Sequence, residues 1–370
     1  MPMPDYDQVA AYLELDPDNE ALIADAAHAA LDAGRSDDAA ALAARHRAIA
    51  GPTPAMDHVL GLAAMAAQDW TAAAAAFRRM LDTGVDEPAV RYNLAWSLAM
   101  TGDKNGALSV LDDATAAAVP QAAELLVGLL HECGEMDRAE AVAREAVARF
   151  PDHRGLNAAV STLAIDLEDL ELARATAARA GDHPEALVTQ ATLALDEEDM
   201  AAAGALFDAA LVRHPDNPRA LVGRGLVALA HDDRTAATAD LDRGAGLFGT
   251  HLGSWIAAGW AHVLAGDVAA ARARFERALS VDDIFAEAHG SLAVLDILAG
   301  NVEDGRRRTE VAQRLDRDSF SAALAAAMLA AGGGDRARAE KIVALALSTT
   351  VDEKGRTIGQ ALARIGARGS

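Results

Sequence analysis

The sequence lacks the residues from which a disulfide framework, a β-sheet or an aromatic-rich core is built. Among 370 residues there is one cysteine, Cys133, which excludes an internal disulfide and fits a reducing compartment. It stands at an apolar helix end, where we expect a packed thiol. Aromatic residues make up only 4% of the chain, and no β-branched runs alternate at period two as strands require. Alanine dominates the apolar residues, and because alanine is the strongest helix former the chain is predicted to be all-helical.

Basic residues are also scarce. Lys and Arg number 33 against 56 Asp and Glu, which gives a net charge of −23. Such a surface repels phosphate backbones and anionic lipid, so we expect no nucleic-acid and no membrane partner. An apolar or basic partner fits better. An acidic surface that serves only to keep the protein dispersed is the alternative.

Targeting signals are missing at the start of the sequence. The first residues contain neither a basic region nor an apolar core, so no signal peptide is expected. No uncharged stretch reaches the ~20 residues that a membrane span needs. Together with the single cysteine, these absences predict a cytoplasmic protein.

Motifs that carry chemistry are absent as well. The sequence contains no Gly-rich phosphate loop, no His-Glu-x-x-His, no Cys-x-x-Cys and no Gly-x-Ser-x-Gly, and its eleven histidines show no metal-ligand spacing. We therefore predict no catalytic residue, no metal and no cofactor. The alternative is an enzyme, or the regulatory subunit of one, that binds a small molecule by a mechanism hidden in the sequence.

What the sequence does have is a period. A turn residue, in most cases with an acidic neighbour, is followed five positions later by a small residue, and this mark recurs ten times. The turn residues are Gly34, Gln68, Gly102, Gly134, Glu168, Glu198, Asp232, Gly266, Gly300 and Gly334. The gaps are 34 residues except for one of 32 and one of 30. This period indicates a stack of similar units, with imperfect stacking near residues 115–120 and 178–184.

Each unit reads as helix A, a short turn and helix B. A small residue stands seven positions before the turn in nine of the ten units, and alanine usually stands five positions after it. In the unit whose turn is Gly266 these residues are Gly259 and Ala271. We predict that the two positions meet across the hairpin and let the two helix backbones approach closely.

The residues of these units resemble the tetratricopeptide repeat (TPR) family. The best matching unit contains Trp255, Gly259, Gly266, Asp267, Ala271, Phe275 and Ala278, and a second contains Leu60, Gly61, Asp69, Trp70, Ala73 and Phe77. The resemblance covers about ten repeats, roughly residues 18–350. It implies an all-α fold, a right-handed superhelical solenoid of antiparallel helix hairpins in which helices A line the inner surface.

The repeat marks divide the chain into four segments. An N-terminal cap segment is expected over residues 1–17, repeats 1–5 over 18–183, repeats 6–10 over 184–350, and a C-terminal capping helix and tail over 351–370. Caps are expected because a solenoid must cover its terminal apolar faces. The glycine-rich run 244–253 is predicted to be either a hinge or a loose connection.

A partner is expected to bind along the inner face formed by helices A. Positions ten, six and three residues before each turn share one side of the helix. The candidate partner-binding residues on that side are Tyr92, Trp96, His131, Leu226, Ile256 and Trp260. Trp96 and Trp260 are the expected anchors, with Gly128 and Gly290 leaving space beside the two rings. The alternative is that both tryptophans pack on neighbouring helices.

These features predict a non-catalytic interaction scaffold, adaptor or chaperone-like module that binds a protein or peptide segment. Some TPR families grip acidic chaperone tails with Lys, Arg and Asn on helix A, and that cluster is missing here. A self-associating structural or assembly protein is the alternative, and the oligomeric state stays open. Acidic pairs at the turns of repeats five to seven, such as Glu168-Asp169, form a solvated edge, or bind a basic partner or Ca²⁺ weakly.

Overall fold

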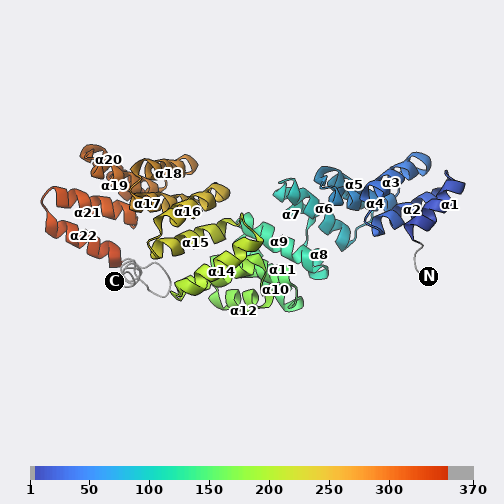
Figure 1. Ribbon diagram of the computed structural model, residues 1–370, viewed down its shortest axis with the longest axis horizontal. Helices are drawn as coiled ribbons and strands as arrows, with labels where there is room; N and C mark the ends of the chain where they lie inside the picture. The colour runs from blue at the N-terminus through green and yellow to red at the C-terminus, as the bar shows by residue number, and fades with distance from the viewer. Residues whose placement is uncertain (1–4, 349–370) are drawn as a thin grey trace. The chain divides into compact units, whose positions relative to one another are not determined.

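The computed structural model describes residues 5–348 and divides into two compact units, unit 1 (Met1–Thr189) and unit 2 (Gln190–Ser370). The helices of unit 1 are α1 (Tyr6–Leu15), α2 (Glu20–Asp32), α3 (Ser36–Ala50), α4 (Pro54–Ala66), α5 (Trp70–Asp82), α6 (Pro88–Met100), α7 (Lys104–Val110), α8 (Asp113–Ala118), α9 (Pro120–Glu132), α10 (Met136–Arg149), α11 (Arg154–Asp166) and α12 (Leu170–Ala180) (Figure 1). Helix α13 (Pro184–Asp196) contains the boundary between the units.

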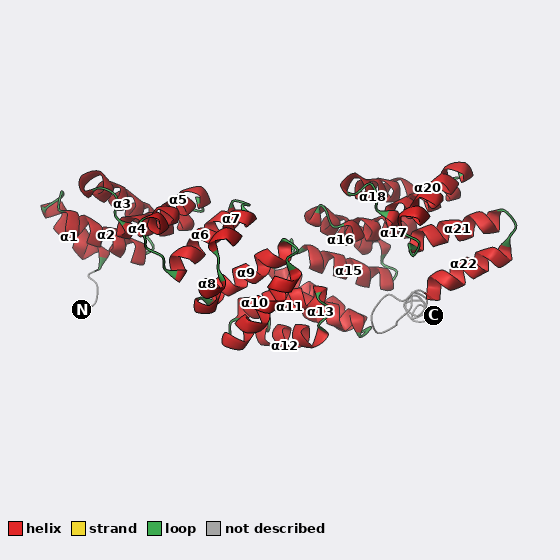
Figure 2. Ribbon diagram, turned by 180° about the vertical axis from the view of Figure 1, so that it is seen from behind, coloured by secondary structure: helices red, strands yellow, loops and turns green. Residues whose placement is uncertain are grey.

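Unit 2 continues with helices only. They are α14 (Met200–Arg213), α15 (Pro218–Ala230), α16 (Arg234–Phe248), α17 (Leu252–Ala265), α18 (Val268–Val281), α19 (Ala286–Leu298), α20 (Val302–Leu315), α21 (Phe320–Gly332) and α22 (Arg336–Ser348). Every regular element within residues 5–348 is therefore a helix (Figure 2). None of these helices is long and apolar enough to cross a membrane.

Within each unit the helices form hairpins that stack one upon the next. Helices A pack on their own helices B, as α4 does on α5 and α15 on α16, and helices B pack on the following helices A, as α5 does on α6 and α16 on α17. Helices A also contact one another, as α2 contacts α4 and α19 contacts α21. The predicted all-α solenoid of helix hairpins is confirmed.

The ends of the repeat array differ in what the structure describes. Helix α1 packs on α2, where Val9 and Leu13 are buried against Ile23 and Ala26. This contact covers an apolar face of the first repeat. The capping helix expected in 351–370 lies outside the described residues.

A residue in the left-handed backbone conformation ends helix A at all ten repeat marks. The four marks that are not glycine, with φ between 57° and 64°, are Gln68, Glu168, Glu198 and Asp232. In the second repeat the Gln68 N–H donates to Met65 O at 3.0 Å, and the Asp69 N–H donates to Ala64 O at 2.9 Å. These bonds satisfy carbonyls that the end of helix A leaves free, and only a left-handed residue brings the chain back to make them.

The acidic residue after the turn begins helix B. The Asp69 carboxylate accepts a hydrogen bond from the Ala72 N–H at 3.0 Å. The same N-cap bond recurs at Asp103, Asp169, Asp199, Asp233, Asp267 and Asp335. A carboxylate here satisfies a free N–H and lies at the positive end of the helix dipole. One acid of each acidic turn pair thus has a structural role, and residues 5–348 contain no group of three or more side chains placed to hold a metal ion.

Glycines of helix A make room for aromatic rings of helix B. Phe77 is fully buried over Gly61, and a Cβ on that glycine would lie 2.6 Å from the ring Cζ. The buried ring of Phe275 lies against Gly259 in the same way. In these two repeats the ring nine residues after the turn requires glycine at this position, and the predicted meeting with the alanine five after the turn stays a prediction.

Helix B of the third repeat is broken, next to the first short gap in the period. The helix stops at Val110, Leu111 becomes extended, and Asp112 begins α8 by accepting from the Thr115 N–H at 2.7 Å. Leu111 remains buried in the core of unit 1. The imperfect stacking predicted near residues 115–120 therefore takes the form of a helix divided in two.

The glycine-rich run 244–253 is divided between the end of α16, a short connection at residues 249–251 and the start of α17. Helix α16 continues through Gly244 and Gly246 to Phe248, and Gly249 leaves it with a φ of 68°. A Cβ on Gly244 would lie 2.8 Å from the Val222 side chain of α15. Because glycine here permits a close contact between α15 and α16, residues 244–248 are neither a hinge nor a loose connection.

Cys133 also departs from expectation. It is the C-cap residue of α9 and is exposed, so the prediction of a packed thiol is wrong. The residue directly precedes the left-handed Gly134, and the chain at this turn runs through solvent rather than through the hairpin interface.

Buried carboxylates connect neighbouring hairpins. Asp296 of α19 accepts from Arg272 of α18 at 2.6 Å and from Arg308 of α20 at 2.9 Å, and only 8% of its side chain is exposed. Asp57 of α4 is similarly buried and accepts from Arg79 of its own hairpin at 2.7 Å and from Arg47 of the preceding α3 at 3.4 Å. Each carboxylate gives the stack a fixed polar contact, because a buried charge is tolerated only where it is paired.

Candidate functional site

The most distinctive surface of unit 1 lies on helices α6 and α9, which are helices A of consecutive repeats. Tyr92 and Trp96 stand one turn apart on α6, with ring centroids 6.2 Å apart and ring planes inclined by 44°. Tyr92 packs against the core of unit 1. Trp96 is half-buried and is not among the described side chains that pack on that core. The two rings therefore extend from the core of unit 1 to a partly exposed side of α6.

Helix α9 places Glu124 and Gly128 beside these rings. Glu124 and Tyr92 both stand ten residues before their turns, and Gly128 and Trp96 both stand six before, so stacking makes each pair neighbours. A Cβ on Gly128 would meet no atom within 4 Å, which leaves open space on this side of α9. This open space agrees with the room predicted on α9, and that it lies beside the Trp96 ring stays a prediction.

The pKa shifts of Tyr92 and Glu124 agree with the proximity of the two side chains. Burial, followed by the nearby Glu124 carboxylate, raises the pKa of Tyr92 above its ordinary value. Burial also raises the pKa of Glu124, and His153 opposes that change. The Glu124 carboxylate rests against Gly155 in the first turn of α11, where a Cβ would collide with it.

His131, the third predicted residue of unit 1, is engaged with the next repeat. Its Nε2 lies 2.7 Å from Asp166 Oδ2, and 16% of its side chain is exposed. Asp166 ends α11, so this contact ties the ends of two helices A together. The geometry gives His131 a part in stacking, whereas Glu124 on the same helix has the more accessible polar group.

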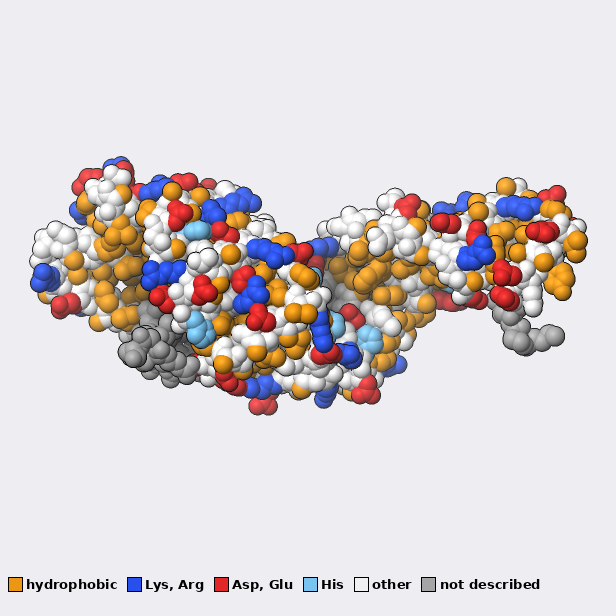
Figure 3. Space-filling model, viewed as in Figure 1, with side chains coloured by type: hydrophobic (Ala, Val, Ile, Leu, Met, Phe, Trp, Pro, Cys, Tyr) orange, Lys and Arg blue, Asp and Glu red, His pale blue; other side chains and the backbone are white. Residues whose placement is uncertain are grey.

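Two histidines lie further along the same set of helices. Burial lowers the pKa of His58, and repulsion from His28 of the preceding repeat lowers it further, while Glu87 acts in the opposite direction. His58 also meets the edge of the Phe77 ring, with centroids 6.4 Å apart. Hydrophobic side chains gather on the surface beside α6 and α8 (Figure 3).

The predicted residues of unit 2 form a separate set. Trp260 lies edge-on to the buried Phe275, with centroids 5.7 Å apart, and packs against Leu292, Leu295 and Ala293 of α19. Ile256 joins the same core. Trp260 therefore follows the packing alternative more closely than Trp96 does.

Two further sequence expectations for unit 2 meet different outcomes. Gly290, expected to leave space beside Trp260, is instead pressed against α21, where a Cβ would lie 2.5 Å from the Ala322 backbone nitrogen. That expectation is wrong, because the glycine serves the contact between α19 and α21. Leu226 on α15 is 41% exposed.

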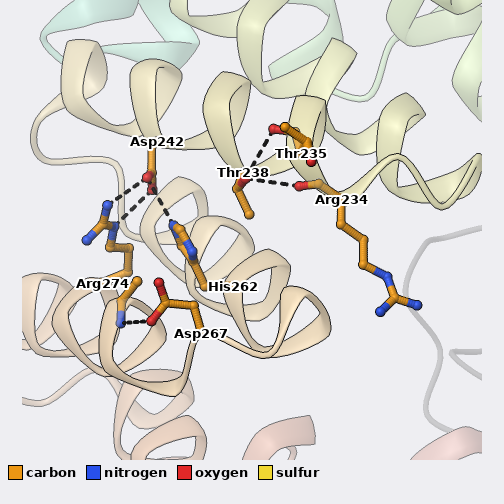
Figure 4. A network of polar contacts seen from close by, with 8 residues as sticks. Arg234, Thr235, Thr238, Asp242, His262, Asp267 and Arg274 are labelled. Atoms are coloured by element: carbon orange, nitrogen blue, oxygen red, sulfur yellow. Dashed lines mark hydrogen bonds and ion pairs between the residues drawn. The ribbon is translucent and has the colours of Figure 1, made fainter.

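A polar network joins three helices of unit 2. Asp242 of α16 accepts from Arg274 of α18 at 2.6 and 2.9 Å, and its Oδ2 lies 3.0 Å from His262 Nε2 of α17 (Figure 4). Burial alone would raise the pKa of Asp242, but the bonds from Arg274 and His262 outweigh it and hold the pKa below its ordinary value. The network consists of one carboxylate, one guanidinium and one imidazole that bond to one another, which is the geometry of a structural tie between repeats.

Sequence reasoning did not choose Glu124 as a candidate residue, although Glu124 stands on the same side of the helix as His131, which was chosen. The available signal was the shared repeat position of Tyr92 and Glu124, ten residues before successive turns. That spacing predicts lateral contact between the two side chains, which periodicity within one helix does not reveal.

Stacked antiparallel hairpins with a half-buried aromatic pair on helices A define a helical-repeat solenoid. Two segments, residues 58–123 and 188–248, match the family model described as tetratricopeptide repeat. These two segments carry tetratricopeptide repeats, as the sequence resemblance implied. No curated protein matches the sequence.

Solved structures with the same kind of fold are numerous and distant in sequence. An IFIT1 monomeric mutant with Gppp-AAAA is 10% identical, with a TM-score of 0.54, and the match covers 89% of this chain and 90% of that one. MamA is 18% identical with a TM-score of 0.37, over 45% and 91%. PilF of Pseudomonas aeruginosa is 14% identical with a TM-score of 0.45, over 55% and 94%. The IFIT1 likeness supports the fold alone.

Proposed function

We propose that this protein is a non-catalytic interaction scaffold that binds a protein or peptide segment on the inner face of unit 1. The observation that carries the proposal is the state of Trp96, a large ring that is half-buried outside the core, next to open space at Gly128. Aromatic residues in such positions are frequent hot spots of binding, because they bury much apolar area with little loss of side-chain freedom.

Charge supports a partner that is apolar or basic. With a net charge of −23, the surface repels polyanions over the range of the Debye length. The IFIT1 structure holds Gppp-AAAA, but that ligand belongs to IFIT1, and the charge of the present chain disfavours a phosphate-bearing ligand of this kind. We therefore propose a protein or peptide as the partner on the inner face of unit 1, and neither a nucleic acid nor a cofactor.

The proposal is tested by selecting a random peptide library on the intact chain and measuring the enriched peptides against Trp96→Ala. Loss of the anchor should weaken binding by about 30-fold or more, the ratio that ~2 kcal/mol at a hot spot represents. Circular dichroism checks that the variant stays folded. Trp260→Ala is the comparison, since its ring packs in the core and its loss should lower stability.

Two results would contradict the proposal. One is a selection that enriches no peptide. The other is a set of peptides that bind wild-type and Trp96→Ala protein equally well, which would put the binding surface elsewhere.

Self-association is a second candidate function, favoured by an exposed apolar strip on unit 2. Its residues stand two positions before and after the turns of consecutive repeats and are 42–61% exposed: Leu264, Val268, Leu298 and Val302. Sedimentation velocity over a range of concentrations tests this function. Replacing Leu264 and Leu298 by serine should abolish any concentration dependence, and a monomer at all concentrations would dismiss it.

A further inference from the structure

The inner face of unit 1 brings together two aromatic rings and one carboxylate. Tyr92 and Trp96 are inclined to each other by 44°, so their faces do not cover one another. The Glu124 carboxylate acts on the Tyr92 phenol from the next repeat. Beside it, the surface at Gly128 is open. Two π-faces and a negative charge around an open space are the components of a cation site.

The negative charge of Glu124 is not satisfied by a described neighbour. The nearest basic atom is His153 Nδ1, at 3.7 Å from Glu124 Oε2. That nitrogen accepts a hydrogen bond from the Leu156 N–H at 3.1 Å as the N-cap of α11. In the neutral form of His153 that accepts this bond, Nδ1 carries no proton to give to Glu124. Within residues 5–348 no hydrogen-bond donor reaches this carboxylate.

Other acids on helices A contrast with Glu124. Asp57 is paired with two arginines, and Asp166 with His131. Glu124 keeps 38% of its side chain exposed. Partial burial of a carboxylate without a hydrogen-bond donor costs desolvation free energy. A bound cation offsets this cost by pairing with the carboxylate.

We propose that Tyr92, Trp96 and Glu124 form a subsite for one Arg or Lys side chain of the segment that unit 1 binds. This inference rests on the proposed function and names the chemistry of its partner. The cation lies between the carboxylate and the ring faces, where the ring quadrupoles and the negative charge act together. The glycine at position 128 gives the alkyl stem of the side chain room to pass α9.

The test uses the peptides enriched on the intact chain. Each shared Arg is replaced by citrulline, which keeps the shape without the charge, and each shared Lys by acetyl-lysine. Fluorescence anisotropy then gives the Kd for wild type, Glu124→Gln and Trp96→Ala. Glu132→Gln is the matched control, since it makes the same charge change on α9 in a residue already paired with Lys104 at 2.8 Å.

The expected result is a thermodynamic cycle with strong coupling. Removing the peptide charge should weaken binding to wild type about tenfold, and should weaken binding to Glu124→Gln much less. Glu132→Gln should behave as wild type. Rising salt should weaken the charged peptide more than the neutral one.

The outcomes separate this inference from the proposed function. Peptides that need Trp96 but share no basic residue, or whose charge effect is unchanged in Glu124→Gln, would overturn the cation subsite and leave the scaffold intact. Peptides that bind Trp96→Ala as well as wild type, or a selection that enriches none, would overturn both.

Discussion

The Phe77 ring occupies the space that any side chain on Gly61 would need. A Cβ built on Gly61 lies 2.6 Å from Phe77 Cζ and 2.8 and 2.9 Å from the two Cε atoms, and Phe77 is fully buried. The ring is held by the core of unit 1 and has no free direction in which to move. One glycine and one phenylalanine thus set how closely helices A and B approach in this repeat.

Gly61→Ala should lower the stability of unit 1 by about 1–2 kcal/mol. Overpacking costs ~1–3 kcal/mol, while the better helix propensity of alanine returns up to ~1 kcal/mol, so the steric cost wins. Gly128→Ala is the control, because its Cβ meets nothing within 4 Å and only the propensity gain of about 0.5–1 kcal/mol applies. Urea denaturation followed by circular dichroism measures both. A Gly61→Ala protein as stable as Gly128→Ala would show that the ring contact is not tight.

A double variant gives an independent check of that contact. In the background of Phe77→Leu, a smaller side chain leaves room for a Cβ on Gly61. The cost of Gly61→Ala should therefore fall well below its cost in wild type, a non-additivity expected of residues in contact. Simple addition of the two single costs would contradict the geometry.

Gln68→Gly should stabilise the second hairpin by about 0.5–1 kcal/mol. Gln68 holds a left-handed conformation with φ of 59°, which costs a residue with a Cβ ~1–2 kcal/mol, partly offset by the greater freedom of glycine in the unfolded chain. The reverse change, Gly102→Ala at φ 85°, should destabilise by about 1 kcal/mol. Thermal melting compares the two. A lower Tm for Gln68→Gly would mean that the glutamine side chain stabilises the turn more than its backbone strains it.

Asp296→Ala should cost about 3 kcal/mol, because it leaves Arg272 and Arg308 without the carboxylate between them. Asp304→Ala is the matched control on α20. Its carboxylate pairs with Arg307 at an exposed position, where an ion pair contributes ~0–1 kcal/mol. Repeat arrays unfold in parts, so hydrogen exchange of α18, α19 and α20 is the proper measurement. Equal protection in both variants would contradict the buried role of Asp296.

Much of this architecture could be predicted because it depends on local chemistry. The left-handed residue that ends helix A recurs at a fixed distance, and the register alone located Gln68, Glu168, Glu198 and Asp232 although none is glycine. The N-cap acid follows the turn directly, so its position was visible even before its bond to the helix B backbone was known. The repeat fold could therefore be predicted, because the residues that end helix A and begin helix B are set by local turn chemistry.

Side-chain roles between repeats could not be predicted in this way. Trp96 and Trp260 have the same place in their repeats, yet Trp260 is covered by Phe275 and by leucines of the next hairpin. Gly244 has a low helix propensity, but packing against Val222 of α15 outweighs it. The burial of each tryptophan and the packing of Gly244 depend on the residues that a neighbouring helix places against them. A pattern along one helix does not contain that information.

Protonation of His58 should destabilise unit 1 in mild acid. Its pKa in the folded chain lies below the ordinary 6.5, first because the ring is partly buried and next because His28 repels its charge. Between the lowered value and 6.5 the unfolded chain binds more protons than the folded chain, so stability rises with pH in this window. The contribution is fully present above pH 6.5 and is lost as the pH falls through the lowered pKa. In His58→Gln, which cannot titrate, the fall in Tm between pH 7.5 and pH 5 should be smaller than in wild type. An unchanged fall in the variant would mean that other groups cause the acid sensitivity, and a larger fall would reverse the sign of the argument.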